Sequence, residues 1–141
     1  MLQTAIDLLH EEDLTCVIIG RGETLRFRLR GIRPMTDTLR DHPEVLRNAY
    51  IADRIIGKAA AMLAVAGGAS AVYGEVMSEP GLQMLQKHGV AAQYGTLTPA
   101  IRNRENTGLC PMEQTVQPID DPQAALPALL ATLARLSEGA K

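Results

Sequence analysis

Hydrophobic and polar positions along the chain alternate between helical and extended spacing. Residues 2–12 repeat leucine and isoleucine at helical intervals, which predicts a short amphipathic helix. Residues 14–19 are largely apolar and predict a strand, while residues 24–30 alternate strictly between apolar side chains and arginines. Because a short glycine-containing turn at 20–22 separates these segments, we expect them to form an antiparallel hairpin.

The rest of the chain predicts further helices and strands in turn. In order, these are a loosely helical connection at 34–47, a helix at 53–66 that ends at Gly67 and Gly68, a strand at 70–77, a helix at 78–88, a strand at 90–98, a polar loop at 99–108, a short helix or turn at 110–116, and a helix at 121–137. This order is typical of an α/β fold with a mixed sheet that the hairpin opens. We expect one domain over residues 1–141.

Composition limits the classes of function. Hydrophobic residues make up 46% of the 141 residues but aromatic residues only 3%, so the core must consist of aliphatic and methionine side chains. A net charge of -2 provides no general attraction to nucleic acid or anionic lipid, and we expect neither as a partner. Two cysteines are too few for a disulfide framework. With no apolar run of about 20 residues, a soluble cytoplasmic protein is expected.

Four short segments contain the most unusual residue choices, at 53–63, 78–80, 103–104 and 110–113. Each lies at a predicted helix start or strand end, where α/β proteins bind ligands. The candidate catalytic residues are Cys110 and Lys58. The candidate ligand-binding residues are Asp53, Arg54, Ser78, Asn103, Arg104 and Glu113.

Arg54 and Lys58 are like charges four residues apart in the first turns of the predicted helix at 53–66. Their repulsion and the positive helix N-terminus are both unfavourable, so an anion there would be stabilising. Asp53 could instead supply the compensating charge as the helix cap. The sequence leaves open whether a phosphate or carboxylate ligand or Asp53 plays this part.

Cys110 occupies the expected N-cap of a short helix, with Pro111 at the first helical position. Glu113 stands where a capping-box acid would reach back to the Cys110 amide. The helix dipole would favour a nucleophilic or redox-active thiolate, but a capping or packed cysteine is the commoner role. Cys16, inside an apolar strand, is expected in the core.

The other candidates each have a structural alternative. Ser78 is more often a plain helix cap than a ligand donor. Asn103 and Arg104 could bind a carboxylate or phosphate or could form a solvated loop. The arginines of the strand at 24–30 favour protection of an edge strand over phosphate binding, because no aromatic residues alternate with them.

The segments G-K-A-A-A at 57–61, N-R at 103–104 and C-P-M-E at 110–113 resemble the DUF1893 (TM1506-like) family. The resemblance covers nearly the whole chain. It implies a three-layer α/β/α fold of the cytidine deaminase-like superfamily, in which assembly into a homodimer or larger homo-oligomer is common. The family has no established function to transfer.

The chain departs from true deaminases at their zinc site. Those enzymes carry a His/Cys-Ala-Glu motif and a Pro-Cys-x-x-Cys motif at successive helix starts, which supply three zinc ligands and a proton-shuttling glutamate. Here the matching positions are Lys58-Ala-Ala60 and Ser78-Glu-Pro-Gly-Leu-Gln83. Glu79 cannot replace two thiolates. We therefore expect no zinc-dependent deamination, no metal ligands and no cofactor.

Two hypotheses remain. In the first, a deaminase-like domain without zinc binds an anionic, nucleotide-like small molecule, and Cys110 is available for chemistry. In the second, the domain is a non-catalytic binding or oligomeric assembly module whose candidate residues only cap helices. The first predicts that the candidates converge on one hollow, and the second that they disperse.

Overall fold

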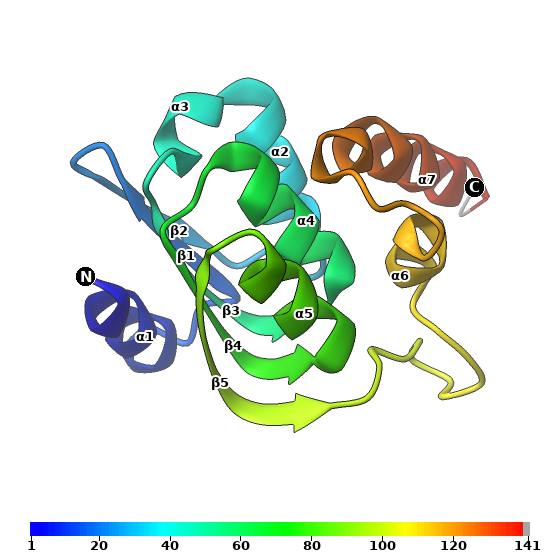
Figure 1. Cartoon of the computed structure of the whole chain (residues 1–141), viewed down its shortest axis with the longest axis horizontal. Coiled ribbons are helices and arrows are strands. Elements are labelled where there is room, and N and C mark those ends of the chain that lie inside the picture. The colour runs from blue at the N-terminus through cyan, green and yellow to red at the C-terminus, as the bar shows by residue number, and fades with distance from the viewer. Residues whose placement is uncertain (140–141) are drawn as a thin grey trace.

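A mixed five-stranded sheet organises the chain, whose residues 1–139 the computed structural model describes (Figure 1). The strands are β1 (Cys16–Gly20), β2 (Glu23–Phe27), β3 (Tyr50–Ile56), β4 (Ala71–Ser78) and β5 (Ala91–Thr98). Their order across the sheet is β2-β1-β3-β4-β5. β1 is antiparallel to both β2 and β3, whereas β3, β4 and β5 are parallel. The predicted hairpin is confirmed, and the fold is α/β.

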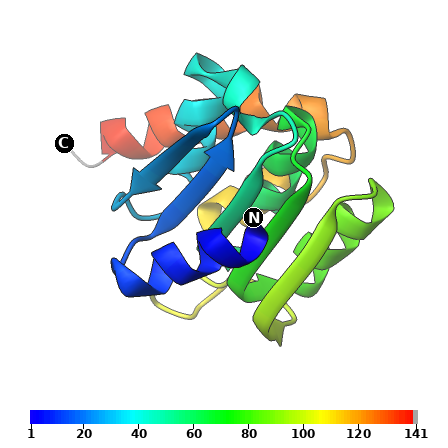
Figure 2. The ribbon, with the colours of Figure 1, turned by 90° about the vertical axis from the view of Figure 1, so that its left-hand side faces the viewer.

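Helices cover both faces of this sheet. They are α1 (Leu2–Glu11), α2 (Arg33–Asp41), α3 (Pro43–Leu46), α4 (Lys58–Gly67), α5 (Glu79–Lys87), α6 (Pro111–Val116) and α7 (Ala125–Gly139), with a 3₁₀ turn η1 (Pro122–Ala124) before α7. α1 packs alone on one face, across β1, β3 and β4 (Figure 2). The other helices lie on the opposite face, where α4 contacts α2, α3, α5, α6 and α7. None of the described helices is long and apolar enough to cross a membrane.

The central helix α4 is buried nearly all round because its side chains are small. Residues 59–64 are each at most 4% exposed. The three successive alanines at 59–61 let neighbouring helices approach closely, and Met62 and Leu63 are fully buried in the core. α4 ends at Gly68, which adopts the left-handed conformation (φ +82°) that glycine tolerates. The predicted stop at these glycines is correct.

The predicted start of this helix is wrong. Residues 50–56 form β3, a central strand between β1 and β4, and the helix begins only at Lys58. The adjacent Ile55 and Ile56 favour extended backbone, and Gly57 separates strand from helix. Arg54 and Lys58 are therefore not an i,i+4 helical pair, and Asp53 is not a helix cap.

Other boundaries differ less. β2 ends at Phe27 rather than at residue 30, and Leu29, expected on the covered face of that strand, is 52% exposed. The predicted helix at 78–88 and strand at 90–98 correspond to α5 and β5. In the last helix the first turn is η1, and Pro127 falls in the first turn of α7, where a missing backbone donor costs little.

Candidate functional site

A cavity of about 830 Å³ opens at the end of the sheet where the parallel strands have their carboxyl ends. Its wall contains the end of β3, the segment before β1, the segment after β2, the segment after β5, and the starts of α4 and α6. Because β1 runs antiparallel to β3, the start of β1 lies at the same end of the sheet as the carboxyl end of β3. This is the position where open α/β sheets bind ligands.

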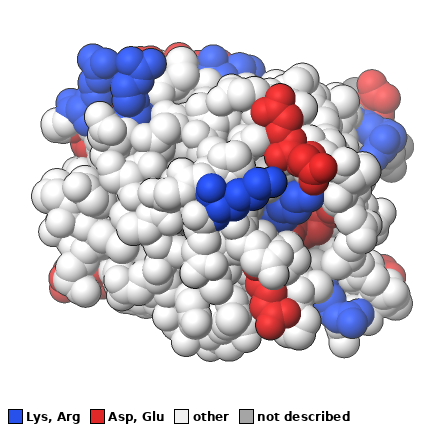
Figure 3. All heavy atoms as spheres, viewed as in Figure 1, with Lys and Arg blue, Asp and Glu red and all other residues white. Residues whose placement is uncertain are grey.

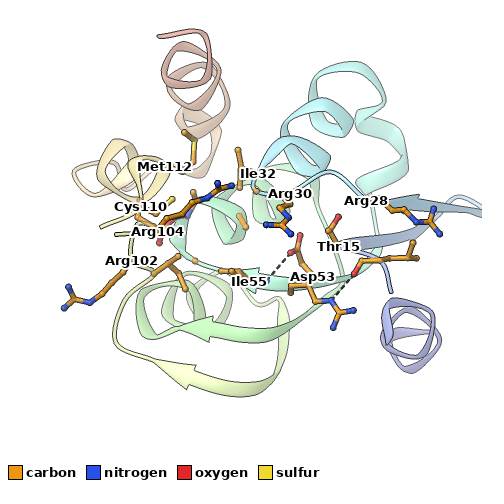
Figure 4. A pocket seen from close by; sticks show the side chains of 18 of the residues that line it. Thr15, Arg28, Arg30, Ile32, Asp53, Ile55, Arg102, Arg104, Cys110 and Met112 are labelled. Atoms are coloured by element: carbon orange, nitrogen blue, oxygen red, sulfur yellow. Dashed lines mark hydrogen bonds between the residues drawn. The ribbon is translucent and has the colours of Figure 1, made fainter. Parts of the chain in front are cut away.

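Asp53 places a buried carboxyl group in this cavity. The residue is 8% exposed, and its Oδ1 accepts a hydrogen bond of 3.2 Å from the backbone N–H of Ile55 (Figure 4). Burial raises the pKa of the Asp53 carboxyl to about 7, although hydrogen bonds from Ile55 and Cys16 and the charge of Arg54 oppose the rise. Within residues 1–139 Asp53 makes no ion pair. The group can therefore accept or donate a hydrogen bond near neutral pH.

Arginines from two loops surround the mouth of the cavity. They are Arg28, Arg30, Arg102 and Arg104. Arg30 and Arg104 reach towards the centre from opposite sides, whereas Arg28 and Arg102 lie at the outer ends (Figure 4). In the described part of the chain none of the four makes an ion pair or a side-chain hydrogen bond. Their donors are free to bind an anion.

Much of the remaining lining is apolar. It includes Ile32, Ile55, Ala59, Ala60, Ile101 and Met112. Ile55 is 53% exposed although it lies in a central strand, because its side chain faces the opening. Exposed aliphatic surface beside unpaired guanidinium groups suits a ligand that has both an apolar and an anionic part.

Glu113 closes the cavity floor at the N-terminus of α4. Its Oε1 accepts the Lys58 N–H at 2.7 Å and its Oε2 accepts the Ala59 N–H at 2.9 Å. The predicted capping box with Cys110 is therefore wrong, because α6 is oriented so that its acid caps α4 instead. The helix N-terminus does bind an anion, as expected for its dipole, and this anion is a side chain of the same protein.

Gly57 makes this arrangement sterically possible. A Cβ atom at this position would lie 2.4 Å from Oε1 and 2.9 Å from Oε2 of Glu113. The glycine backbone is in the ordinary extended region (φ −97°, ψ −171°), so its role is space and not an unusual conformation. Gly57 immediately precedes α4, and Glu113 lies in the first turn of α6, 56 residues later. Their contact accounts for a glycine at one position and an acid at the other.

Comparison with known proteins places the chain in a family. A family model described as a domain of unknown function (DUF1893) matches residues 4–132. The chain belongs to the DUF1893 family. The matched range contains every residue that lines the cavity. No curated protein matches the sequence.

A solved structure of another protein is similar to this DUF1893 chain over most of its length. It is a DUF1893 family protein (TM1506) from Thermotoga maritima, with a TM-score of 0.83 and 22% sequence identity. The match covers 92% of this chain and 88% of that one. At this identity the similarity shows a shared fold.

Five of the eight residues singled out from the sequence line the cavity of this DUF1893 protein. They are Asp53, Arg54, Arg104, Cys110 and Glu113. Arg54 contributes mainly to the wall, because its guanidinium donates to the carbonyls of Leu9 and Leu14 and to the Glu75 carboxylate. It thereby attaches α1 to the sheet.

The other three do not line it. The Lys58 Nζ donates to the Gln117 carbonyl at 3.2 Å, away from the opening. Ser78 is fully buried and caps α5 through the Gly81 N–H, which agrees with its structural alternative. Asn103 holds its own loop by hydrogen bonds to the backbone and side chain of Thr107.

The two cysteines differ as expected. Cys16 is completely buried, and burial raises the pKa of its thiol well above the usual value. Cys110 is half-buried at the N-cap of α6 and lines the cavity. Its thiol is therefore the one that a bound molecule could contact.

Arg28, Arg30 and Arg102 line the cavity but are not among the candidates predicted from the sequence. The sequence predicts Arg28 and Arg30 on the charged face of a strand at 24–30, but β2 ends before them. The Thr15 hydroxyl hydrogen-bonds the carbonyls of Phe27 and Leu29, which holds this segment beside the cavity. Gly31, with φ +79°, follows immediately and was the one sequence indication that the strand does not continue.

Proposed function

We propose that this DUF1893 protein binds a small anionic, nucleotide-like molecule in the arginine-ringed cavity. The observation that carries the proposal is the set of four cavity arginines without an ion pair in residues 1–139, above a lining that is largely aliphatic. Unpaired guanidinium groups bind phosphate or carboxylate through paired N–H donors.

Different parts of such a ligand would contact different groups in the cavity. Arg30 and Arg104 would grip the anionic group from opposite sides, since both reach the centre. Ile32, Ile55 and Met112 would pack against a ring or other apolar part. Asp53 would hydrogen-bond a polar edge of that part, as donor or acceptor according to its protonation.

We also propose that the domain is a member of the cytidine deaminase-like superfamily with its three-layer α/β/α arrangement. Helices on both faces of a mixed sheet and a cavity at the strand ends support this. Zinc-dependent deamination is not part of the proposal, because Lys58 and Ser78 replace the metal ligands in the sequence. No three His, Cys, Asp or Glu residues gather into a metal-binding group in residues 1–139.

A second candidate function is a non-catalytic binding or assembly module. The specific observation in its favour is that Lys58, Ser78 and Glu113 all have structural partners. The two candidates differ at Cys110: chemistry on a ligand would need its thiol to contact the bound molecule, whereas an assembly role would not. We further propose a cytoplasmic location, which the two free cysteines support.

The test is a thermal-shift screen of nucleoside phosphates and phosphosugars with the wild type, Arg30→Met and Arg104→Met. Arg135→Met, an exposed arginine of α7 outside the cavity lining, is the matched control. We expect at least one ligand to raise the melting temperature of the wild type and the control. Each cavity variant should weaken binding about tenfold or more, because a hydrogen bond to a charged group contributes about 1.5–3 kcal/mol.

Alkylation of Cys110 by iodoacetamide provides a second readout for the same ligands. A ligand seated in the cavity should slow the reaction in the wild type and in Arg135→Met. If no ligand in the screen stabilises the wild type, or if the cavity variants respond as the control does, the anion-binding proposal is wrong and the assembly module is favoured.

A further inference from the structure

β5 is an open edge of the sheet. It is the last strand in the order, with β4 on one side and no strand on the other. α5 packs over one face of β5, whereas α1 lies across β1, β3 and β4 (Figure 2). The strand is accordingly exposed along most of its length, and the Tyr94 side chain is 41% exposed.

The backbone groups that face outward can be identified. The Ala91 N–H donates to the Ser70 carbonyl, so the N–H and C=O of Ala91 point towards β4. Because these groups alternate in direction along a strand, those of Ala92, Tyr94 and Thr96 point away from β4. Among the described residues no strand pairs with this side.

The two edges of the sheet differ in how they are protected. β2, at the other edge, has Glu23 and Arg26, and Arg26 forms an ion pair with Glu12 at 3.2 Å. Charges on an edge strand oppose pairing with another sheet. In contrast, residues 88–101 contain no Lys, Arg, Asp or Glu, and β5 has no proline. Charged atoms are sparse over α5 and β5 in Figure 3.

We propose that β5 pairs antiparallel with β5 of a second copy of this chain, so that the two sheets become continuous across a two-fold axis. Such an axis places the outward N–H and C=O groups of one strand opposite those of the other. β5 is eight residues long and has neither a charged residue nor a proline that would oppose pairing with an identical strand. The partner that this edge fits is therefore an identical edge.

Helix α5 supports the same partner through its charges. Glu79 lies in its first turn and Lys87 in its last, and both are on the exposed side of the helix. An antiparallel pairing of β5 makes the two α5 helices antiparallel as well, so Glu79 of each copy lies towards the Lys87 end of the other. Because α5 packs on both β4 and β5, the helices would be about two strand spacings, or roughly 10 Å, apart, which is a normal packing distance.

This inference does not depend on ligand binding. Residues 91–98 are absent from the cavity lining, and no cavity arginine lies in β5. Failure of one proposal would leave the other standing.

The test measures molar mass by light scattering for the wild type, Thr96→Pro and Thr24→Pro. Proline at residue 96 removes an outward donor and leaves the inward ladder to β4 in place. Thr24 provides the matched control, because it is also exposed on an edge strand. The Phe27 carbonyl points towards β1, and because the direction alternates at each residue, the Thr24 N–H three positions earlier points away from β1. We expect the wild type and Thr24→Pro to have twice the monomer mass of 15.2 kDa and Thr96→Pro to have the monomer mass.

A monomeric wild type, a dimeric Thr96→Pro or a monomeric Thr24→Pro would each overturn the inference. Hydrogen exchange on the wild type tests it without a variant, in case Thr96→Pro does not fold. The Tyr94 and Thr96 amides should exchange at least tenfold more slowly at concentrations where the dimer forms than after dilution. Equal exchange at both concentrations would contradict pairing through β5.

Discussion

At the scale of single residues, Asp53 is the most informative side chain. It is a carboxyl group that is buried in a cavity without an ion-pair partner in residues 1–139. Its raised pKa means that ionising it in the folded protein is unfavourable. A ligand that hydrogen-bonds this group would offset part of that cost, which supports its proposed part in recognising a polar edge of the ligand.

Asp53→Asn should alter how stability depends on pH. The folded-state pKa is about 7 against an ordinary value of 3.8, so between about pH 4 and pH 7 the folded protein keeps a proton that the unfolded chain releases. Wild-type stability should fall as pH rises through this window, by about 4 kcal/mol at most from this group. Asparagine keeps the acceptor for the Ile55 N–H and does not titrate.

Urea unfolding at pH 5, 6, 7 and 8 measures this effect. The stability of Asp53→Asn relative to wild type should increase steadily up to about pH 7 and then level off. Asp120→Asn, at an exposed position, is the control and should run parallel to wild type. Parallel curves for Asp53→Asn would show that the carboxyl group is not perturbed.

At the scale of elements, the junction between β3 and α4 organises the cavity. The junction turns from a central strand to a buried helix within one residue, Gly57. Glu113, supplied by α6, then binds the first two free N–H groups of α4. The short α6 therefore positions both Cys110 and Met112 by docking its acid onto another helix.

A double-mutant cycle of Gly57→Ala and Glu113→Ala tests this junction. Glu113→Ala should lower the free energy of unfolding by about 1–2 kcal/mol, because two helix N–H groups lose their acceptor. Gly57→Ala alone should also destabilise, since the new methyl group would overlap the carboxylate. In the Glu113→Ala background that overlap disappears, and the same substitution should cost about 1 kcal/mol less. Additive effects in urea unfolding would contradict the contact.

The element that sequence patterns did not predict is β3. Its two central charged residues, Asp53 and Arg54, interrupt an otherwise apolar strand and favoured a helix start instead. The physical reason is tertiary: Asp53 is buried in the cavity wall, and Arg54 bonds to α1 and β4 on the other face. Neither contact is visible in local spacing, whereas the hairpin, α5 and β5 follow from alternation and turn residues alone.

At the scale of the whole molecule, the cavity exists only because distant segments meet. The loops after β2 and β5 each supply one of the two central arginines, Arg30 and Arg104. From the sequence, Arg104 is a candidate because it follows a strand, whereas Arg30 is placed on a predicted strand where edge protection is favoured over phosphate binding. The Thr15 hydrogen bonds and Gly31 end that strand early. The location of the cavity at the carboxyl ends of strands was predictable from the sequence. The full set of arginines that line it was not.

We propose that anions bind this cavity through Arg30 and Arg104. The most direct measurement is a titration of the wild type with inorganic pyrophosphate, and separately with a nucleoside diphosphate, followed by NMR of the arginine Nε–H groups and the Ile55 amide. We predict saturable shifts at Arg30 and Arg104 with both probes, further shifts at Ile55 with the nucleoside diphosphate, and none at Arg135. Unchanged Arg30 and Arg104 signals, or shifts of equal size at Arg135, would contradict the account.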